Sequence, residues 1–301
     1  MKRRFKHIIF RFAPKPVIDS LKRIKKKYRN QRLAKQAQKG GVSKDDMLTQ
    51  LKTIGINEGD VVLVHSALSK IGYVSGGAQS VVEALLEAVG ETGHVLMPNS
   101  PNNGRQLDYI RQLECFDVLN SPSKLGAISE YFRKLPQAKR SIHPTEPVSC
   151  IGPDSAYFVD AHMGQLTPYN EYSPFYRVAK RSGKILMIGV TLDNAGTNLH
   201  CLEDAVAFQY PVYYDQIFTV NVKDENGVIH KVQTKVHNPE WSSKRKCDEL
   251  LPLFEKEGVL TYHKLGEAKV LLFDAQKMLT TMIEMYTNHG ITMYHPSIHV
   301  K

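Results

Sequence analysis

Cysteine is scarce in this chain of 301 residues, and its spacing excludes two kinds of site. The four cysteines are widely separated and form no CxxC pair: Cys115, Cys150, Cys201 and Cys247. We therefore expect neither a zinc site nor a disulfide framework, and this usage fits a reducing cytoplasm. The sequence also lacks any apolar run of about 18 residues, the length that predicts a membrane-spanning helix. The few apolar residues after the first lysines and arginines are too short a run for a signal peptide.

Acidic residues are almost absent from the first forty positions. Residues 1–40 contain 15 Lys or Arg but a single acid, Asp19, so they carry a net charge of +14. The remaining residues hold 25 Lys or Arg and 29 Asp or Glu, a net charge of −4. The chain therefore divides into a basic N-terminal arm, residues 1–40, and a mildly acidic globular body, residues 41–301.

The arm has three interpretations. Its second part, Val17–Gln38, has the pattern of a helix with a narrow apolar stripe and basic faces elsewhere. It is either a solvated leader that packs loosely on the body or an interfacial helix on an anionic membrane surface, where each Lys or Arg adds about 1 kcal/mol. Binding to nucleic acid is the third interpretation. It is the weakest one, because the basic charge stops at the arm and no recognisable binding module follows. Membrane binding would place the protein at the cytoplasmic face of a membrane.

The body alternates short apolar strands with amphipathic helices, and 42% hydrophobic content is enough for a core. A capping box at Ser43 and Asp46 opens the first of the predicted helices, at 44–53, 77–89, 124–135, 173–180 and 197–208. Strands are predicted at 61–65, 94–98, 147–151 and 184–190. This alternation predicts an α/β fold with a mixed central sheet flanked by helices. A hairpin after Phe218 and a last strand and helix, 268–273 and 275–289, predict a C-terminal β-rich portion.

Polar side chains follow the first strand at the point where it ends. His65, Ser66 and Ser69 come directly after the apolar run Val61–Val64, and a glycine turn and a helix come next. In an α/β sheet, the loop after a strand is the default ligand site. We therefore expect this loop to bind a ligand.

Five sequence segments together resemble one known family. They are VHSALSKIG at 64–72, GGAQSVVEALLEAVGETG at 76–93, RSIHP at 140–144, SPFYRV with GKILMIGV at 173–190, and TNLHCLED at 197–204. Their order and spacing resemble the aminoglycoside 3-N-acetyltransferase family, which transfers an acetyl group from acetyl-coenzyme A to an amino sugar. The resemblance runs from about Asp45 to the C-terminal helix. The pyrophosphate loop of the other large acetyltransferase class, the GNAT fold, is absent.

The resemblance implies a catalytic histidine at His200. Transfer to an amine needs a general base with a pKa near neutrality. Glu203 lies three residues further on and shares a helix face with His200, so it can orient the imidazole. Cys201 is no partner for a nucleophilic pair, because adjacent helix positions diverge by about 100°.

The resemblance also implies the cofactor loop. Backbone amides and hydroxyls at a strand or helix end hold the phosphates and pantetheine of coenzyme A in this interpretation. The residues implied are His65, Ser66, Ala67, Leu68 and Ser69, with Ser121 in a second cofactor-side segment, LNSPSKLG. No group of His, Cys or Asp has metal-ligand spacing, and the reaction needs no metal.

The sequence departs from the family at the second acid, which is expected after the hairpin. Counted from Gly227, the position falls at Val236 or His237. Either His237 replaces the acid or Glu240 reaches into the site. Trp241, beside Glu240, either stacks on a sugar ring or belongs to the core.

These observations predict an acetyl-coenzyme A-dependent N-acetyltransferase that acts on an amino sugar. We expect the acceptor to belong to surface-polysaccharide or glycolipid synthesis, because the body is only mildly acidic and the basic arm suits a membrane face. An aminoglycoside antibiotic is the alternative acceptor. A non-catalytic coenzyme A-binding or membrane-associated protein is the second alternative, because the acid position is altered.

Overall fold

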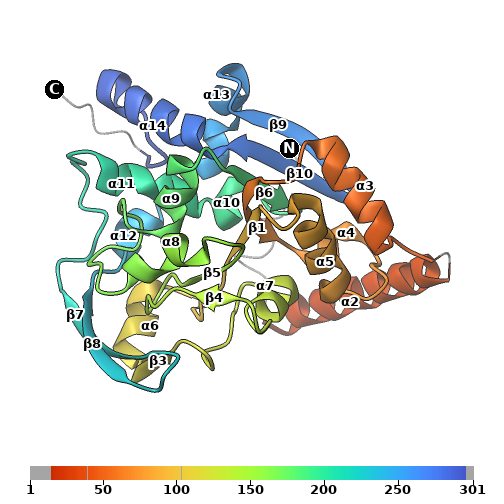
Figure 1. The fold of residues 1–301 in the computed structure, drawn as a ribbon, viewed down its shortest axis with the longest axis horizontal. Coiled ribbons are helices and arrows are strands. Elements are labelled where there is room, and N and C mark those ends of the chain that lie inside the picture. The colour runs from red at the N-terminus through yellow and green to blue at the C-terminus, as the bar shows by residue number, and fades with distance from the viewer. Residues whose placement is uncertain (1–14, 39, 103, 296–301) are drawn as a thin grey trace.

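Seven strands form a mixed sheet on which the rest of the body is built (Figure 1). A computed structural model describes residues 15–38, 40–102 and 104–295, so the predicted arm is described only from residue 15. The strand order is β4-β5-β2-β1-β6-β10-β9. The strands are β1 (Val61–Ser66), β2 (His94–Pro98), β4 (Lys139–Arg140), β5 (Val148–Ile151), β6 (Lys184–Ile188), β9 (Leu260–Leu265) and β10 (Ala268–Asp274). The central strand β1 is parallel to both neighbours, β2 and β6, whereas β5 and β10 pair antiparallel with the strands beside them.

Alternate residues of the central strands enter two separate cores, one on each face of the sheet. On β1, Leu63 packs into one core, while Val62 and Val64 pack into the other. This is the period-2 pattern of a strand that is buried on both faces. The predicted α/β class, with helices on both sides of a mixed sheet, is therefore confirmed.

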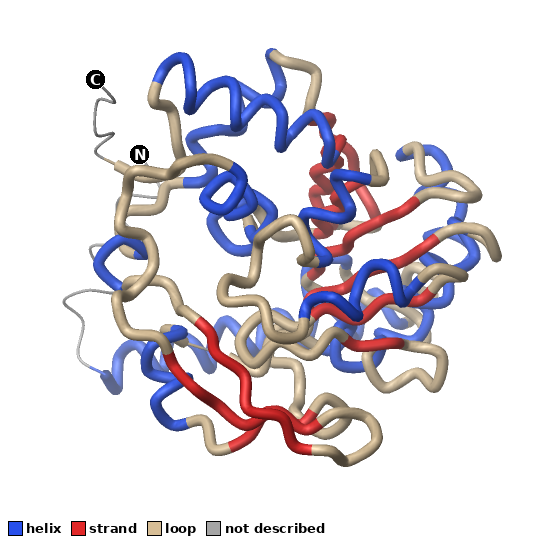
Figure 2. Tube along the Cα trace, turned by 60° about the vertical axis from the view of Figure 1, so that its left-hand side comes forward, coloured by secondary structure: helices blue, strands red, loops and turns tan. Residues whose placement is uncertain are grey.

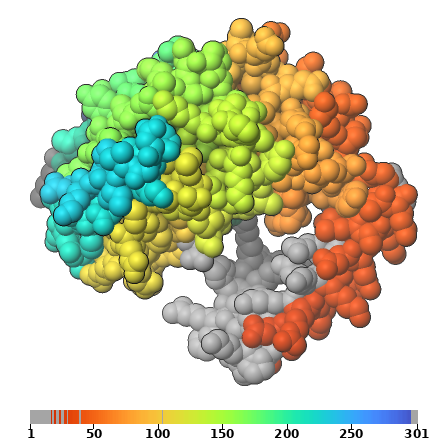
Figure 3. Space-filling model, turned by 60° about the horizontal axis from the view of Figure 1, so that its bottom comes forward, coloured from red at the N-terminus to blue at the C-terminus, as the bar shows by residue number. Residues whose placement is uncertain are grey.

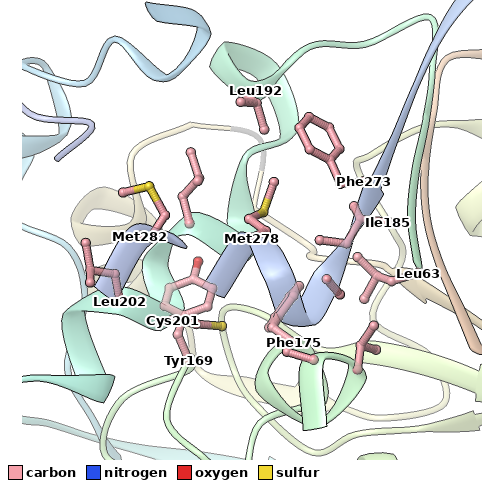
Figure 4. Packing of buried hydrophobic residues seen from close by; sticks show 14 of the residues in the cluster. Leu63, Tyr169, Phe175, Ile185, Leu192, Cys201, Leu202, Phe273, Met278 and Met282 are labelled. Atoms are coloured by element: carbon pink, nitrogen blue, oxygen red, sulfur yellow. The ribbon is translucent and has the colours of Figure 1, made fainter. Parts of the chain in front are cut away.

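Two sets of helices cover these faces (Figures 1 and 2). The first set consists of α3 (Lys44–Ile54), α5 (Ala78–Val89) and α7 (Ala127–Phe132). The second set consists of α8 (Ser155–Val159), α9 (Pro174–Lys180) and α14 (Ala275–His289). Figure 4 shows Met278 and Met282 of α14 among buried side chains of this second core, with Tyr169 and Leu202 nearby. The second core thus reaches the segment that carries the predicted catalytic histidine.

The predicted hairpin is present, but it belongs to a second, smaller sheet. Its strands β7 (Phe218–Lys223) and β8 (Ile229–Thr234) pair antiparallel, and β3 (Cys115–Asp117) joins β7 in parallel. A small core of its own lies between this sheet and α6 (Gln106–Gln112). The predicted last strand lies elsewhere, in the large sheet as β10, so the β-rich C-terminal part is divided between two sheets.

Short helices surround the edge of the large sheet. They are α4 (Leu68–Ile71), η1 (Asp160–His162), α10 (Leu192–Ala195), η2 (Thr197–His200), α11 (Cys201–Ala205), α12 (Pro239–Ser242), η3 (Cys247–Leu250) and α13 (Leu251–Lys256). The predicted single helix over 197–208 is wrong in its extent. It consists of a 3₁₀ turn and a five-residue helix, and the backbone at Val206 is already extended. The helix predicted over 124–135 is likewise shorter, at Ala127–Phe132.

The arm helix α2 (Lys15–Ala37) runs along the body and contacts it near its C-terminal end (Figure 3). Arg32 forms an ion pair with Glu267 at 3.1 Å. Gln36 donates to Glu267 and accepts from the backbone N–H of Tyr73. Beyond Gly40 and Gly41, the predicted capping box of α3 is present, with Ser43 and Asp46 each bonded to the other's backbone. No helix in the described residues is long and apolar enough to cross a bilayer.

Candidate active site

A cavity of about 510 Å³ opens at the edge of the sheet where β1, β2 and β6 end. Because these three strands are parallel neighbours, their carboxyl ends lie together. The loops that follow them supply Ser66, Ser100 and the segment 190–197 to the cavity lining. The opposite wall contains His200, His237 and Arg245. The ligand site expected after the first strand is therefore built from three strand ends and a wall from distant parts of the chain.

Glu203 is the buried centre of a hydrogen-bonded cluster. Its side chain has no solvent exposure, and His200 Nδ1 lies 2.7 Å from Oε1. His237 Nε2 lies 2.9 Å from Oε2. The hydroxyl of Tyr294 donates to Oε1 at 2.5 Å. Three donors on a desolvated carboxylate satisfy its charge and fix both imidazole rings.

Arg245 fixes the protonation of His200. Its Nη1 lies 2.8 Å from Nε2 of His200. A guanidinium can only donate, so Nε2 accepts and the ring proton sits on Nδ1, pointing at Glu203. The geometry therefore holds His200 as a neutral imidazole whose lone pair faces the cavity. An acceptor amine reaches that lone pair only if it displaces the guanidinium.

Two tyrosine rings stack against the two histidines, whose own rings are tilted against each other by 40°. Tyr169 stacks on His200 with ring centroids 4.9 Å apart, and His200 lies 4.2 Å from His237. Tyr213 covers the other side of His237 at 5.2 Å, with its ring nearly parallel. The rings exclude water from the dyad of His200 and Glu203, and this exclusion strengthens the hydrogen bonds to Glu203.

The burial of this cluster sets its charges. Burial lowers the pKa of His200 to about 4, although the carboxylate of Glu203 partly opposes this. Burial alone would raise the pKa of Glu203, but the charges and hydrogen bonds of the two histidines lower it well below its usual range. At neutral pH the site therefore holds a neutral His200 and an ionised Glu203. The imidazole is in the unprotonated form that a general base requires, but its pKa lies below the near-neutral value expected from the sequence.

His200, Glu203 and His237 also form the one group among the described residues whose geometry resembles a metal site, with ligand atoms within 4.8 Å of one another. Sequence spacing missed this group because His237 joins it from a distant loop. The nitrogens facing Glu203 lie at hydrogen-bonding distances from its oxygens, and the guanidinium of Arg245 occupies the remaining nitrogen of His200. The donor atoms are thus engaged as an acid–base cluster.

Two of the predicted cofactor residues line the cavity, and four do not. His65 and Ser66 line it at the end of β1, and His65 Nε2 lies 3.2 Å from the hydroxyl oxygen of Thr197. The backbone N–H of Ala67 is bonded to the carbonyl of Ile188, and Leu68 packs against the core. Ser69 is exposed. Ser121 accepts from the N–H of Asp117 in a turn, so its placement gives its predicted role no support.

The alternatives after the hairpin are separated by the structure. His237, not Glu240, contacts Glu203. Glu240 is exposed and pairs with Lys244 at 2.8 Å. Trp241 is 8% exposed and packs edge-on against Tyr210 in the core, so the stacking role predicted for it lacks an open ring face.

Three residues lie outside the motifs quoted above: Glu146 and Arg245, which line the cavity, and Tyr294, which bonds to Glu203. Tyr294 follows the last helix in an unremarkable segment, and Arg245 belongs to a short basic run, SSKRK. Glu146 lies two residues beyond RSIHP, so extending that motif by two positions would have found it.

Comparison with known proteins decides the family. The model of the aminoglycoside 3-N-acetyltransferase family matches residues 63–287. The chain belongs to this family. Family membership makes it an acyltransferase that takes its acetyl group from acetyl-coenzyme A.

Relatives in the family match between about half and four fifths of the chain. Aminoglycoside N(3)-acetyltransferase IX of Micromonospora chalcea is 27% identical over 256 residues, which are 78% of this chain and 90% of the relative. Aminoglycoside N(3)-acetyltransferase III of Serratia marcescens is 33% identical over 172 residues, 53% of this chain and 63% of the relative. The solved structure of AAC-VIa bound to sisomicin has a TM-score of 0.69 at 29% identity and covers 80% of this chain and 96% of its own.

The acceptor expected from the sequence is wrong. Surface-polysaccharide or glycolipid synthesis was favoured by the basic arm and the weak charge of the body. The curated relatives are instead named for aminoglycosides. The error arose because the arm lies outside the matched residues 63–287, so its charge says nothing about the acceptor pocket.

Replacement of the base tests the cluster. We expect His200→Ala to lower kcat by about 10²- to 10⁴-fold, the usual loss for a general base, and to leave coenzyme A affinity unchanged. Glu203→Gln should lower kcat less, because the amide still accepts a bond from His200. Turnover of acetyl-coenzyme A with sisomicin and calorimetric titration with coenzyme A measure the two quantities. Activity of His200→Ala within threefold of the parent would contradict the assignment.

Ser66 tests the cofactor end of the cavity. Ser66→Phe places a ring in the space beyond β1, so we expect the KM for acetyl-coenzyme A to rise more than the KM for the acceptor. Ser69→Phe is the matched comparison, because Ser69 is exposed and does not line the cavity. A larger effect of Ser69→Phe than of Ser66→Phe on the KM for acetyl-coenzyme A would move the cofactor site out of this cavity.

Proposed function

We propose that the protein acetylates an amino group of an aminoglycoside antibiotic, with acetyl-coenzyme A as the donor. The observation that carries the proposal is the buried pair of His200 and Glu203, whose Nδ1 and Oε1 lie 2.7 Å apart. His200 of this pair lines the cavity at the ends of three parallel strands. The family match and the sisomicin bound to AAC-VIa support an aminoglycoside acceptor.

The geometry supports direct transfer. The acceptor amine displaces Arg245 from His200 Nε2 and attacks the thioester carbon, while Nε2 takes the amine proton. The imidazolium formed is stabilised by the Glu203 carboxylate, which His237 and Tyr294 hold in place. Collapse of the tetrahedral intermediate then breaks the carbon–sulfur bond and releases coenzyme A as a thiolate. The thiolate takes the proton held on His200 Nε2, which returns the imidazole to its neutral form.

A cysteine acyl-enzyme fits the site less well. Cys247 lines the cavity, but burial raises the pKa of its thiol to about 12. Burial also raises the pKa of Cys201, and its side chain lies in the core. Thiolates are the reactive form, so neither cysteine is an activated nucleophile at neutral pH. The amine therefore attacks acetyl-coenzyme A itself.

The acceptor range is the direct test of this function. We expect the purified chain to transfer acetyl from acetyl-coenzyme A to sisomicin, gentamicin or apramycin, with a one-acetyl mass increase in the product. The His200→Ala variant is the control for non-enzymatic acetylation. Absence of transfer to all three antibiotics, with intact coenzyme A binding, would overturn the proposal.

We further propose that the arm binds an anionic membrane surface and holds the enzyme at the cytoplasmic face. On α2, Ile24 and Tyr28 are exposed beside Arg23 and Lys27, which suits an interfacial helix. The contacts of Arg32 and Gln36 tether the last turns of α2 to the body.

Vesicle binding tests the arm. We expect the full chain to sediment with phosphatidylserine vesicles at low salt and to dissociate as salt screens the attraction over about 8 Å. Deletion of residues 1–40 should abolish sedimentation and leave turnover unchanged, because the family match begins at residue 63. Lys256→Glu on α13 is a surface-charge control. Equal binding of the full chain and the truncated chain, or no binding by the full chain, would contradict membrane placement.

A further inference from the structure

Glu146 is a buried acid in the wall of the cavity. It follows Thr145 in the connection between β4 and β5, is 9% exposed and lines the same cavity as His200. Charged side chains are almost never buried without a partner. The other acid that lines the cavity, Asp193, is exposed and accepts from the N–H of Asp248. Glu146 is therefore the buried negative group that a cavity ligand meets.

One oxygen of Glu146 is engaged and the other is open. Gln106 Nε2 donates to Oε1 at 2.5 Å. The same amide accepts, through its own oxygen, from the backbone N–H of His237 at 3.0 Å. Gln106 thereby couples the position of Glu146 to the segment that carries the dyad. The second oxygen, Oε2, accepts no hydrogen bond from any residue that the structure describes.

The surroundings of Glu146 leave its charge incompletely compensated. Burial raises the pKa of its carboxyl to about 7, against the lowering effect of Gln106 and of the Arg245 charge. The other titratable groups nearby are Tyr109 and Tyr169, whose pKa values burial raises, and His143. These three groups bring no positive charge at neutral pH. A ligand cation at Oε2 would therefore complete the site.

We propose that Glu146 binds a second, protonated amino group of the acceptor and so restricts the enzyme to amino sugars that carry at least two amino groups. The proposal rests on the function proposed above. One amine of the acceptor replaces the Arg245 guanidinium at His200, and an ammonium elsewhere on the same molecule donates to Glu146 Oε2. An acceptor with a single amine leaves that oxygen unpaired.

Neutralising Glu146 separates this role from catalysis. We expect Glu146→Gln, which keeps the size of the side chain, to raise the KM for sisomicin by about 10- to 100-fold, the effect of losing a charged hydrogen bond. The KM for acetyl-coenzyme A should stay within twofold, because the subsite holds the acceptor and not the cofactor. Glu249→Gln is the matched control, because Glu249 is an exposed acid on η3 that does not line the cavity.

The pH dependence of binding is an independent readout. Glu146 must be ionised to hold an ammonium, so affinity for sisomicin should fall as pH drops below about 7, where this carboxyl takes up its proton. Glu146→Gln should lose this component. Comparing the two proteins with the same acceptor cancels the titration of the acceptor's own amines. Calorimetric titration with sisomicin from pH 6 to 8 measures the affinity of each protein at each pH.

The outcomes are distinguishable. If the parent enzyme acetylates sisomicin and Glu146→Gln has the same KM and the same pH dependence, the role of Glu146 is overturned and the function stands. If the parent neither binds nor acetylates sisomicin, gentamicin or apramycin, the function fails and this subsite fails with it. If Glu146→Gln does not fold, Glu146→Asp decides. That variant keeps the charge, so it should keep the pH dependence with a raised KM, and an unchanged KM overturns the proposal.

Discussion

The site depends on keeping one carboxylate ionised where water cannot reach it. Glu203 has no exposure, and an isolated charge there would cost several kcal/mol. Donors from three separate segments remove that cost: His200 from η2, His237 after β8, and Tyr294 after α14. Losing one donor therefore disturbs the other two contacts as well as the charge. The same cluster that fixes the orientation and the protonation of His200 also fastens three parts of the chain together.

The large sheet brings these segments into reach. Alternation on β1 and β6 commits both faces of the sheet to cores, so only the strand ends are left for polar side chains. The second core, with α14 across it, carries the η2 segment toward the cavity. On the side of the small sheet, α6 adds Gln106 to the cavity lining. The charges of the cavity are then set by which side chains the short connections present. Arg245 and Glu146 both come from such connections.

Local patterns in the sequence predicted the parts of this structure that local forces determine. The capping box at Ser43, the apolar run of β1 and the hairpin after Phe218 each follow from neighbouring residues, and all three are confirmed. The i, i+3 spacing also predicted the contact of His200 with Glu203. Tyr294 and Arg245 were not predictable in this way, because their contacts join segments far apart in the chain. The five-residue α11 was mistaken for part of a longer helix because its polar and apolar residues continue past Val206, where tertiary contacts, not propensity, set the backbone.

The late position of Tyr294 has a consequence for biosynthesis. A ribosome releases the chain from its N-terminal side, so β1, β6 and the His200 segment emerge long before residue 294 is made. During that interval the nascent chain holds Glu203 without its third donor, and the cover that Tyr294 provides is missing. The cluster around Glu203 is therefore completed only when this segment emerges, and a nascent chain stalled before Tyr294 would expose an unfinished cluster to chaperones and proteases.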